Sequence, residues 1–205
     1  MSKFLFLVKY LKYFFVSKTK YGVHSPFVYD LVTNVLNDKS HKKEYSKIRN
    51  LNVSIINLKH LKLIYRLITH YKLENILEIG DFETLNRTFL SNIKLKANMF
   101  CCNIKTNEIF EINTQNNIQS ESFDFAIFNM QNNDELTLNK FMNHLKYFHN
   151  NSVVVINHIH QSNKMEEVWR KIITQKEVSI SIDLFFIGLV FFRKEQVKEN
   201  FIIRF

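Results

Sequence analysis

The sequence has few of the residues that interrupt a chain or cross-link it. Among 205 residues there are 3 glycines, 1 proline and 2 cysteines. So little glycine and proline excludes a collagen-like or flexible-linker architecture. The cysteines, Cys101 and Cys102, are adjacent, so they provide neither a disulfide framework nor the paired spacing of a zinc site. So few cysteines are typical of the cell interior, and we expect a cytoplasmic protein.

Acidic residues are scarce in the first third of the chain. Residues 1–72 hold 14 Lys and Arg against 3 Asp and Glu, whereas residues 73–205 hold 14 against 16. We therefore divide the chain into a basic helical extension, residues 1–72, and a nearly neutral domain, residues 73–205. The excess of positive charge predicts that the extension contacts an anionic membrane surface or an acidic protein. Nucleic acid is disfavoured, because the basic residues flank apolar helices more than exposed aromatic side chains.

No apolar run is long enough to span a membrane, which takes about 20 residues. The run at Phe4–Val16 is shorter, and the Ser-Lys-Thr-Lys sequence after it is not a signal-peptide cleavage site. We expect an amphipathic helix with Lys9 and Lys12 on one side. Two interpretations stay open for this helix. It covers the core of the domain, or it lies on an anionic membrane surface, which would place the protein at the inner face of the membrane.

From residue 73 on, apolar stretches of strand length alternate with stretches of helical spacing. We expect strands at residues 75–79, 98–104, 123–128 and 152–156, and helices at 27–36, 58–71, 83–93, 134–148 and 162–173. Two more strands, at 177–184 and 187–192, hinge near Gly188 and predict a closing antiparallel hairpin. The alternation predicts an α/β fold with a doubly wound, mostly parallel sheet and helices on both faces.

The end of the first expected strand, Ile76-Leu77-Glu78-Ile79-Gly80, resembles the opening motif of class I S-adenosylmethionine-dependent methyltransferases. Three further stretches resemble a bacterial O-methyltransferase-like branch of that family and follow in the same order: residues 20–29, 159–169 and 182–193. The resemblance implies a Rossmann-like methyltransferase sheet with S-adenosylmethionine (SAM) as cofactor. It also implies methyl transfer to an oxygen of a small molecule.

Ligands of a doubly wound sheet bind beyond the carboxyl ends of its strands. There the resemblance assigns cofactor contacts to Glu78, Gly80, Asn103 and Asn129. Several of these positions depart from the family pattern. Asn103 stands where relatives place a carboxylate on the ribose, Asn129 where they have the Asp of an Asp-Gly pair, and Thr84 where they have a second glycine.

After the fifth strand of the family, two Asp residues hold a divalent cation in many relatives. This chain has Asn157 and His158 there. Magnesium and calcium prefer charged oxygen ligands, so we expect no metal. His158 is the candidate general base, because the reference pKa of histidine lies near neutrality.

The stretch between Asn103 and Asp124 is short, with 20 residues. The usual helix, strand, second helix and turns need about twice that length, so we expect one strand or helix to be missing. Its loss would remove one wall of the cofactor pocket. These changes together predict that cofactor binding is weakened or lost. Two functions stay open: a divergent O-methyltransferase, and a catalytically silent binding or scaffold protein whose basic third contacts an anionic partner.

Overall fold

The computed structural model describes residues 3–46, 54–80, 97–103, 107–111, 122–129 and 134–205. Within these residues a mixed sheet of eight strands has the order β3-β2-β1-β4-β5-β7-β6-β8. The strands are β1 Asn75–Gly80, β2 Asn98–Cys102, β3 Ile109–Glu111, β4 Phe123–Asn129, β5 Phe148–Asn157, β6 Ile180–Asp183, β7 Ile187–Phe191 and β8 Glu199–Ile202. The expected helix at 83–93, and Thr84 within it, lie outside the described residues.

The directions of the strands confirm the mostly parallel sheet with a closing hairpin. β2, β1, β4 and β5 run parallel to one another, and β7 runs antiparallel between β5 and β6. The turn of the β6–β7 hairpin lies at residues 184–186, near the hinge that was expected next to Gly188. Gly188 lies within β7, where an added Cβ would come within 2.5 Å of the Trp169 ring. The glycine is needed for this close packing.

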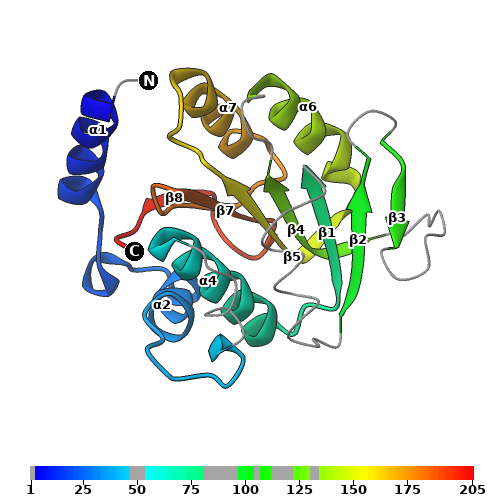
Figure 1. Cartoon of the computed structure of the whole chain (residues 1–205), viewed down its shortest axis with the longest axis horizontal. Coiled ribbons are helices and arrows are strands. Elements are labelled where there is room, and N and C mark those ends of the chain that lie inside the picture. The colour runs from blue at the N-terminus through cyan, green and yellow to red at the C-terminus, as the bar shows by residue number, and fades with distance from the viewer. Residues whose placement is uncertain (1–2, 47–53, 81–96, 104–106, 112–121, 130–133) are drawn as a thin grey trace.

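Helices cover both faces of the sheet (Figure 1). They are α1 Lys3–Val16, η1 Lys20–Gly22, α2 Pro26–Asp30, η2 Leu31–Leu36, α4 Ile55–Tyr71, α6 Asp134–His144, η3 Leu145–Tyr147 and α7 Asn163–Ile173. The hydroxyls of Ser25, Ser54 and Ser162 accept the backbone N–H three residues on and so cap α2, α4 and α7. The helix expected at 134–148 ends earlier, because β5 already begins at Phe148.

Alternation along the central strands builds two apolar cores. Ile76, Phe125 and Val153 pack with the helices of residues 26–71 on one face. Their neighbours Leu77, Ala126 and Val154 pack with α6 and α7 on the other. Successive side chains of a strand point to opposite faces, so Glu78, Asn129 and Asn157 share the face of α4.

The sheet edge beside β2 explains why the stretch between Asn103 and Asp124 is so short. Six residues separate Cys102 from Ile109, too few for a crossover helix. β3 therefore returns beside β2 as an antiparallel hairpin. The third strand is present, and the helix that would join it to β2 in a parallel sheet is missing. At the opposite edge, β8 pairs in parallel with β6 and was not predicted.

The N-terminal helix α1 packs on the β6–β7 turn. Phe6, Tyr10 and Tyr13 place their rings about Phe185, with ring centroids 5.0 to 5.3 Å apart. Just after α1, Lys18 forms a parallel bridge with Ile203. Among the described residues, no helix is long and apolar enough to cross a lipid bilayer.

Candidate functional site

Three residues line up where β1, β4 and β5 end. Gly80 is paired with Asn129, and the Asn157 amide donates a hydrogen bond to Asn129 Oδ1 across 3.4 Å. Gly80 has φ +146°, and a Cβ there would lie 2.2 Å from the Asn129 carbonyl oxygen. A side chain is thus excluded at Gly80 by both conformation and space. The strand ends approach each other closely at the edge where this fold binds ligands.

The buried carboxylate of this edge belongs to Glu78, which is 4% exposed. It lies on β1 two residues before Gly80 and on the face of α4. Asn157 Oδ1 is also buried and has no hydrogen-bond partner among the described residues. A buried acceptor without a donor is costly, so this atom suits a ligand that brings a donor.

Asn103 follows β2 at the same edge, within the tight turn to β3. Its backbone N–H donates to Glu108 O across 2.9 Å, and its carbonyl accepts from Asn107 N–H and from Lys140 Nζ. Lys140 is 2% exposed and also donates to Asn107 Oδ1. A neutral amide and the buried side chain of Lys140 therefore lie together at the position for which the family resemblance predicts a carboxylate.

The described residues fit SAM in part. Gly80 permits the close backbone approach that a cofactor loop needs, and Glu78 and Asn157 Oδ1 supply acceptors beside it. Asn103 supplies an uncharged group, which binds a hydroxyl more weakly than a carboxylate does. The acceptors and the close backbone approach thus lie beside Gly80, and only an uncharged group lies at Asn103.

His158 follows Asn157 and adopts a left-handed conformation, with φ 62°. Its backbone N–H donates to Phe186 O across 2.7 Å, which holds the residue against the β6–β7 turn. Its side chain lines a cavity of about 310 Å³ together with Phe6, Ser54 and Phe186. Burial lowers the pKa of His158, so the imidazole is neutral at pH 7 and able to accept a proton.

A second histidine, His60 of α4, lies near His158. Burial, and then the charges of His158 and Lys59, lower the pKa of His60 to about 4. Its ring is 5.9 Å from that of Phe186, which also lines the His158 cavity. His60 and Lys140 were not expected from the sequence, because each belongs to a helix whose residue spacing does not indicate a position near this edge.

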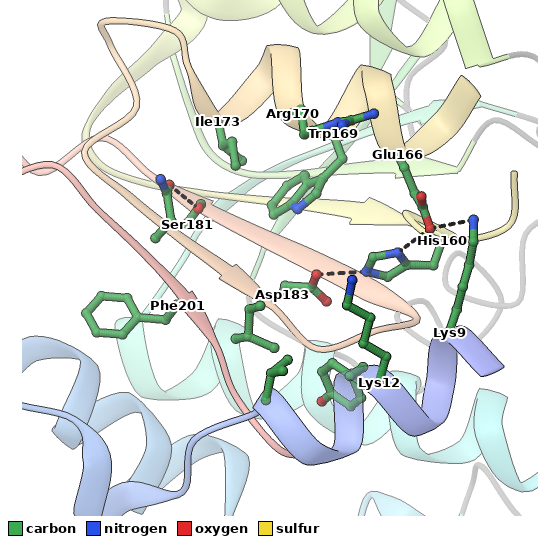
Figure 2. Close-up of a pocket in the computed structure, with 14 residues that line it drawn as sticks. Lys9, Lys12, His160, Glu166, Trp169, Arg170, Ile173, Ser181, Asp183 and Phe201 are labelled. Carbon is green, nitrogen blue, oxygen red and sulfur yellow. Dashed lines mark hydrogen bonds and ion pairs between the residues drawn. The ribbon is translucent and has the colours of Figure 1, made fainter. Parts of the chain in front are cut away.

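His160 lies two residues beyond His158 and contacts acidic side chains of α7 and β6 (Figure 2). Its Nδ1 is 2.9 Å from Glu166 Oε1, and its Nε2 is 2.7 Å from Asp183 Oδ2. Lys9 of α1 completes the group, 2.7 Å from Glu166. Burial alone would lower the pKa of His160, but the hydrogen bonds and charges of Asp183 and Glu166 outweigh it and raise that pKa.

Basic side chains from distant parts of the chain surround a hollow of about 560 Å³. They belong to Lys20, Lys39, Lys59, Lys62, Arg66 and Arg204, with Asp38 as the acid in the lining. Most of the hydrogen-bonding capacity of Arg66 is already used, because its guanidinium donates to the carbonyls of Lys62, Leu36 and Asp38. The hollow gives the basic extension a concentrated positive surface.

The chain resembles several proteins of known structure. The chain is similar to the O-methyltransferase TomG from Streptomyces achromogenes, solved with SAM, at 15% identity and TM-score 0.47, over 75% of this chain and 91% of that one. It is also similar to the methyltransferase PaMTH1 from Podospora anserina, solved with S-adenosylhomocysteine, at 7% identity and TM-score 0.46, over 84% and 98%. No family model and no curated protein sequence matches the chain.

At these sequence identities and TM-scores, the structural similarity supports no conclusion about the activity of this chain. The strand order and directions of the chain itself show the Rossmann-like arrangement. Among the described residues, no group of three His, Cys, Asp or Glu side chains could hold a metal ion.

Proposed function

We propose that the protein is a divergent class I SAM-dependent methyltransferase that transfers a methyl group to an oxygen of a small molecule and binds its cofactor weakly. The observation that carries the proposal is His158, which directly follows Asn157 at the carboxyl end of β5 and lines a cavity with Phe6, Ser54 and Phe186, and whose pKa burial lowers. A base beside a cleft at the carboxyl edge is the arrangement that methyl transfer to a hydroxyl requires.

The residues of the chain have separate roles in this proposal. When bound, SAM supplies an electrophilic methyl group, and the electrons of its broken S–C bond stay on sulfur. His158 accepts the proton that the substrate hydroxyl loses. Asn157 Oδ1 accepts a hydrogen bond from a ligand, and Gly80 leaves room for the cofactor against Asn129.

The first test is calorimetric titration with SAM and with S-adenosylhomocysteine. We expect dissociation constants above about 100 μM. Asn103→Asp should tighten binding about tenfold, because a charged acceptor makes a stronger hydrogen bond to a ribose hydroxyl. The control is Asn98→Asp, the same change at the amino end of the same strand, which should have no effect. Absence of binding at millimolar ligand in both the original chain and Asn103→Asp overturns the proposal.

The second test measures the release of S-adenosylhomocysteine during a screen of small hydroxylated compounds. His158→Ala should abolish turnover while leaving SAM affinity unchanged. His24→Ala, at an exposed position, is the control. A rate with His158→Ala equal to that of the original chain would remove His158 from the proposal.

A second candidate function is favoured by the outer face of α1. Six large apolar side chains form one stripe on it, with Phe4 and Phe15 exposed by 73% and 79%. The stripe consists of Phe4, Leu7, Val8, Leu11, Phe14 and Phe15. The opposite face of α1 already packs on Phe185. A helix apolar on both faces is normally covered on both, so the stripe points to a further contact.

The charges beside the stripe favour an anionic membrane surface as its partner. Lys12 lies on one flank, and the Arg204 guanidinium lies 4.0 Å from the centre of the Phe14 ring on the other. No acidic residue precedes Asp30. Pairing two copies of the stripe would bring like charges together, whereas anionic lipid would neutralise them. In this candidate the chain is a silent binding protein that lies on the bilayer through α1.

Sedimentation with lipid vesicles tests this candidate. The chain should bind vesicles of phosphatidylglycerol mixed with phosphatidylcholine and should not bind phosphatidylcholine alone. Leu11→Glu should abolish the binding, whereas Val197→Glu, at an exposed loop position, should leave it nearly unchanged. Equal binding of both variants contradicts the candidate, and so does a dimer in solution that Leu11→Glu dissociates.

A further inference from the structure

A cavity of about 490 Å³ lies between α1, α7 and the strands β6 and β8 (Figure 2). Its volume falls within the range of about 300 to 1,000 Å³ that small-molecule sites occupy. It differs from the His158 cavity in its lining, which His160 alone shares with it. Neither the methyl-transfer proposal nor the membrane candidate makes use of this space.

Most of the lining is apolar. Trp169 and Ile173 of α7 form one wall, Tyr13 and Val16 of α1 face them, and Phe201 of β8 adds a third side. At the base, the Ser181 hydroxyl donates to Asn200 Oδ1 across 2.6 Å, so its donor is already used. The walls therefore favour the hydrocarbon part of a ligand.

One end of the cavity is polar, and Lys12 adds a positive charge to it. There Lys9, Glu166, His160 and Asp183 form a group in which two basic and two acidic side chains balance. Lys12 and Arg170 also line the cavity, and among the described residues neither takes part in an ion pair. Figure 2 shows Lys12 extending from α1 on the side of Asp183 and His160.

We propose that this cavity is a binding site for a small amphipathic monoanion, a carboxylate with an apolar body. The carboxylate contacts Lys12, with Arg170 at the rim as a second cation. The apolar body lies against Trp169, Ile173 and Val16. An apolar enclosure with uncompensated positive charge at one end selects this chemistry over a neutral or cationic ligand. The site does not depend on the proposed methyl transfer.

The chain provides its own reporter, because Trp169 is its single tryptophan. Decanoate, added below its micelle concentration, should change the tryptophan fluorescence saturably. Calorimetry should give the same dissociation constant. Decanol and decyltrimethylammonium carry the same chain with no charge or the opposite charge. Each should bind at least about tenfold more weakly than decanoate.

Lys12→Met removes the charge and keeps an apolar stem. It should weaken decanoate binding about tenfold and leave decanol binding unchanged. Lys18→Met, outside the cavity, is the matched control and should bind decanoate as the original chain does. Ile173→Phe, which narrows the cavity, should weaken both ligands. Circular dichroism of each variant shows whether the fold is retained.

Three results would each overturn the proposal. The first is an absence of saturable binding of decanoate to the original chain. The second is decanol binding as tightly as decanoate, which would leave the positive end without a role. The third is a folded Lys12→Met variant with unchanged affinity for decanoate. Loss of SAM binding in the earlier titration has no bearing on any of them.

Discussion

His160 Nε2 lies 2.7 Å from a carboxylate oxygen of Asp183, while the other ring nitrogen contacts Glu166. The imidazole is therefore held between two acids, with its ring stacked on Phe185 at 5.0 Å. Through Glu166 the same group reaches Lys9 of α1. The ion pair between Lys9 and Glu166 thus connects this group to α1, beside the aromatic packing on Phe185.

The first prediction concerns the pH dependence of this group. The pKa of His160 is raised in the folded chain, so its contribution to stability is full below pH 6.5 and is lost as the pH rises through the folded pKa. His160→Asn should cost about 2 kcal/mol below pH 6.5 and less at alkaline pH. Urea unfolding of both proteins across this range measures the difference. A cost that stays constant with pH would contradict the prediction.

Glu166 determines the low-pH limit of the range in which this group stabilises the fold. Burial alone would raise the pKa of Glu166, but its hydrogen bonds to Lys9 and His160 outweigh it and lower that pKa. Its contribution is present above the ordinary carboxyl value of 4.5 and is lost as the pH falls through the folded pKa. The effect of Lys9→Met on the free energy of unfolding should therefore shrink in acid.

The second prediction concerns Gly80. Gly80→Ala should destabilise the fold by more than about 3 kcal/mol, because the new Cβ would meet Asn129 O and the backbone would be strained. Gly22→Ala is the control, since its Cβ would make an ordinary 3.4 Å contact with Lys18. Chemical denaturation compares the two variants. Similar stabilities would show that the strand ends separate at little cost.

The third prediction concerns Asp124 at the amino end of β4. Its carboxylate accepts the backbone N–H groups of Glu74 and Asn75 and lies 2.9 Å from His149 Nε2. Asp124→Ala should cost about 2 to 3 kcal/mol, because two N–H groups lose their acceptor. Asp124→Asn keeps one acceptor oxygen and should recover part of this loss. Equal unfolding free energies for the two variants would count against a hydrogen-bonding role.

The fourth prediction concerns the packing of Gly188 against Trp169. A Cβ at Gly188 would lie 2.5 Å from the indole ring, so Gly188→Ala should displace the ring and cost about 1 to 3 kcal/mol. The tryptophan emission should shift to longer wavelength as the ring becomes more exposed. An unchanged emission maximum would mean that α7 moves as a whole.

The central strands could be predicted because their apolar runs are continuous. The buried residues of β1, β4 and β5 pack on both faces, and such runs read as strands without reference to the rest of the fold. The edge strands β3 and β8 could not be predicted in this way. β3 has three residues, and β8 places one buried residue, Phe201, among exposed ones. Pairing with a neighbour makes these segments strands.

Some residues of the candidate site could be predicted from the sequence and others could not. The sequence predicted that Gly80, Asn129 and His158 follow strands, and parallel pairing then places them at one edge. It did not predict His60 and Lys140, which come from helices and meet the edge only through tertiary packing. The pairing of His160 with Asp183 was missed for the same reason. The cofactor-binding roles of the strand-end residues remain predictions, which the SAM titrations test.

The bridge between Lys18 and Ile203 also bears on how the chain folds as it is synthesised. Lys18 N–H donates to Ile202 O and its carbonyl accepts from Arg204 N–H, while the Tyr13 hydroxyl donates to Ile203 O. Tyr13 and Ile203 are 190 positions apart in the sequence. On a ribosome, α1 emerges well before residues 202–204, so these hydrogen bonds can form only late in the synthesis of the chain. Until then both apolar faces of α1 are available to a chaperone.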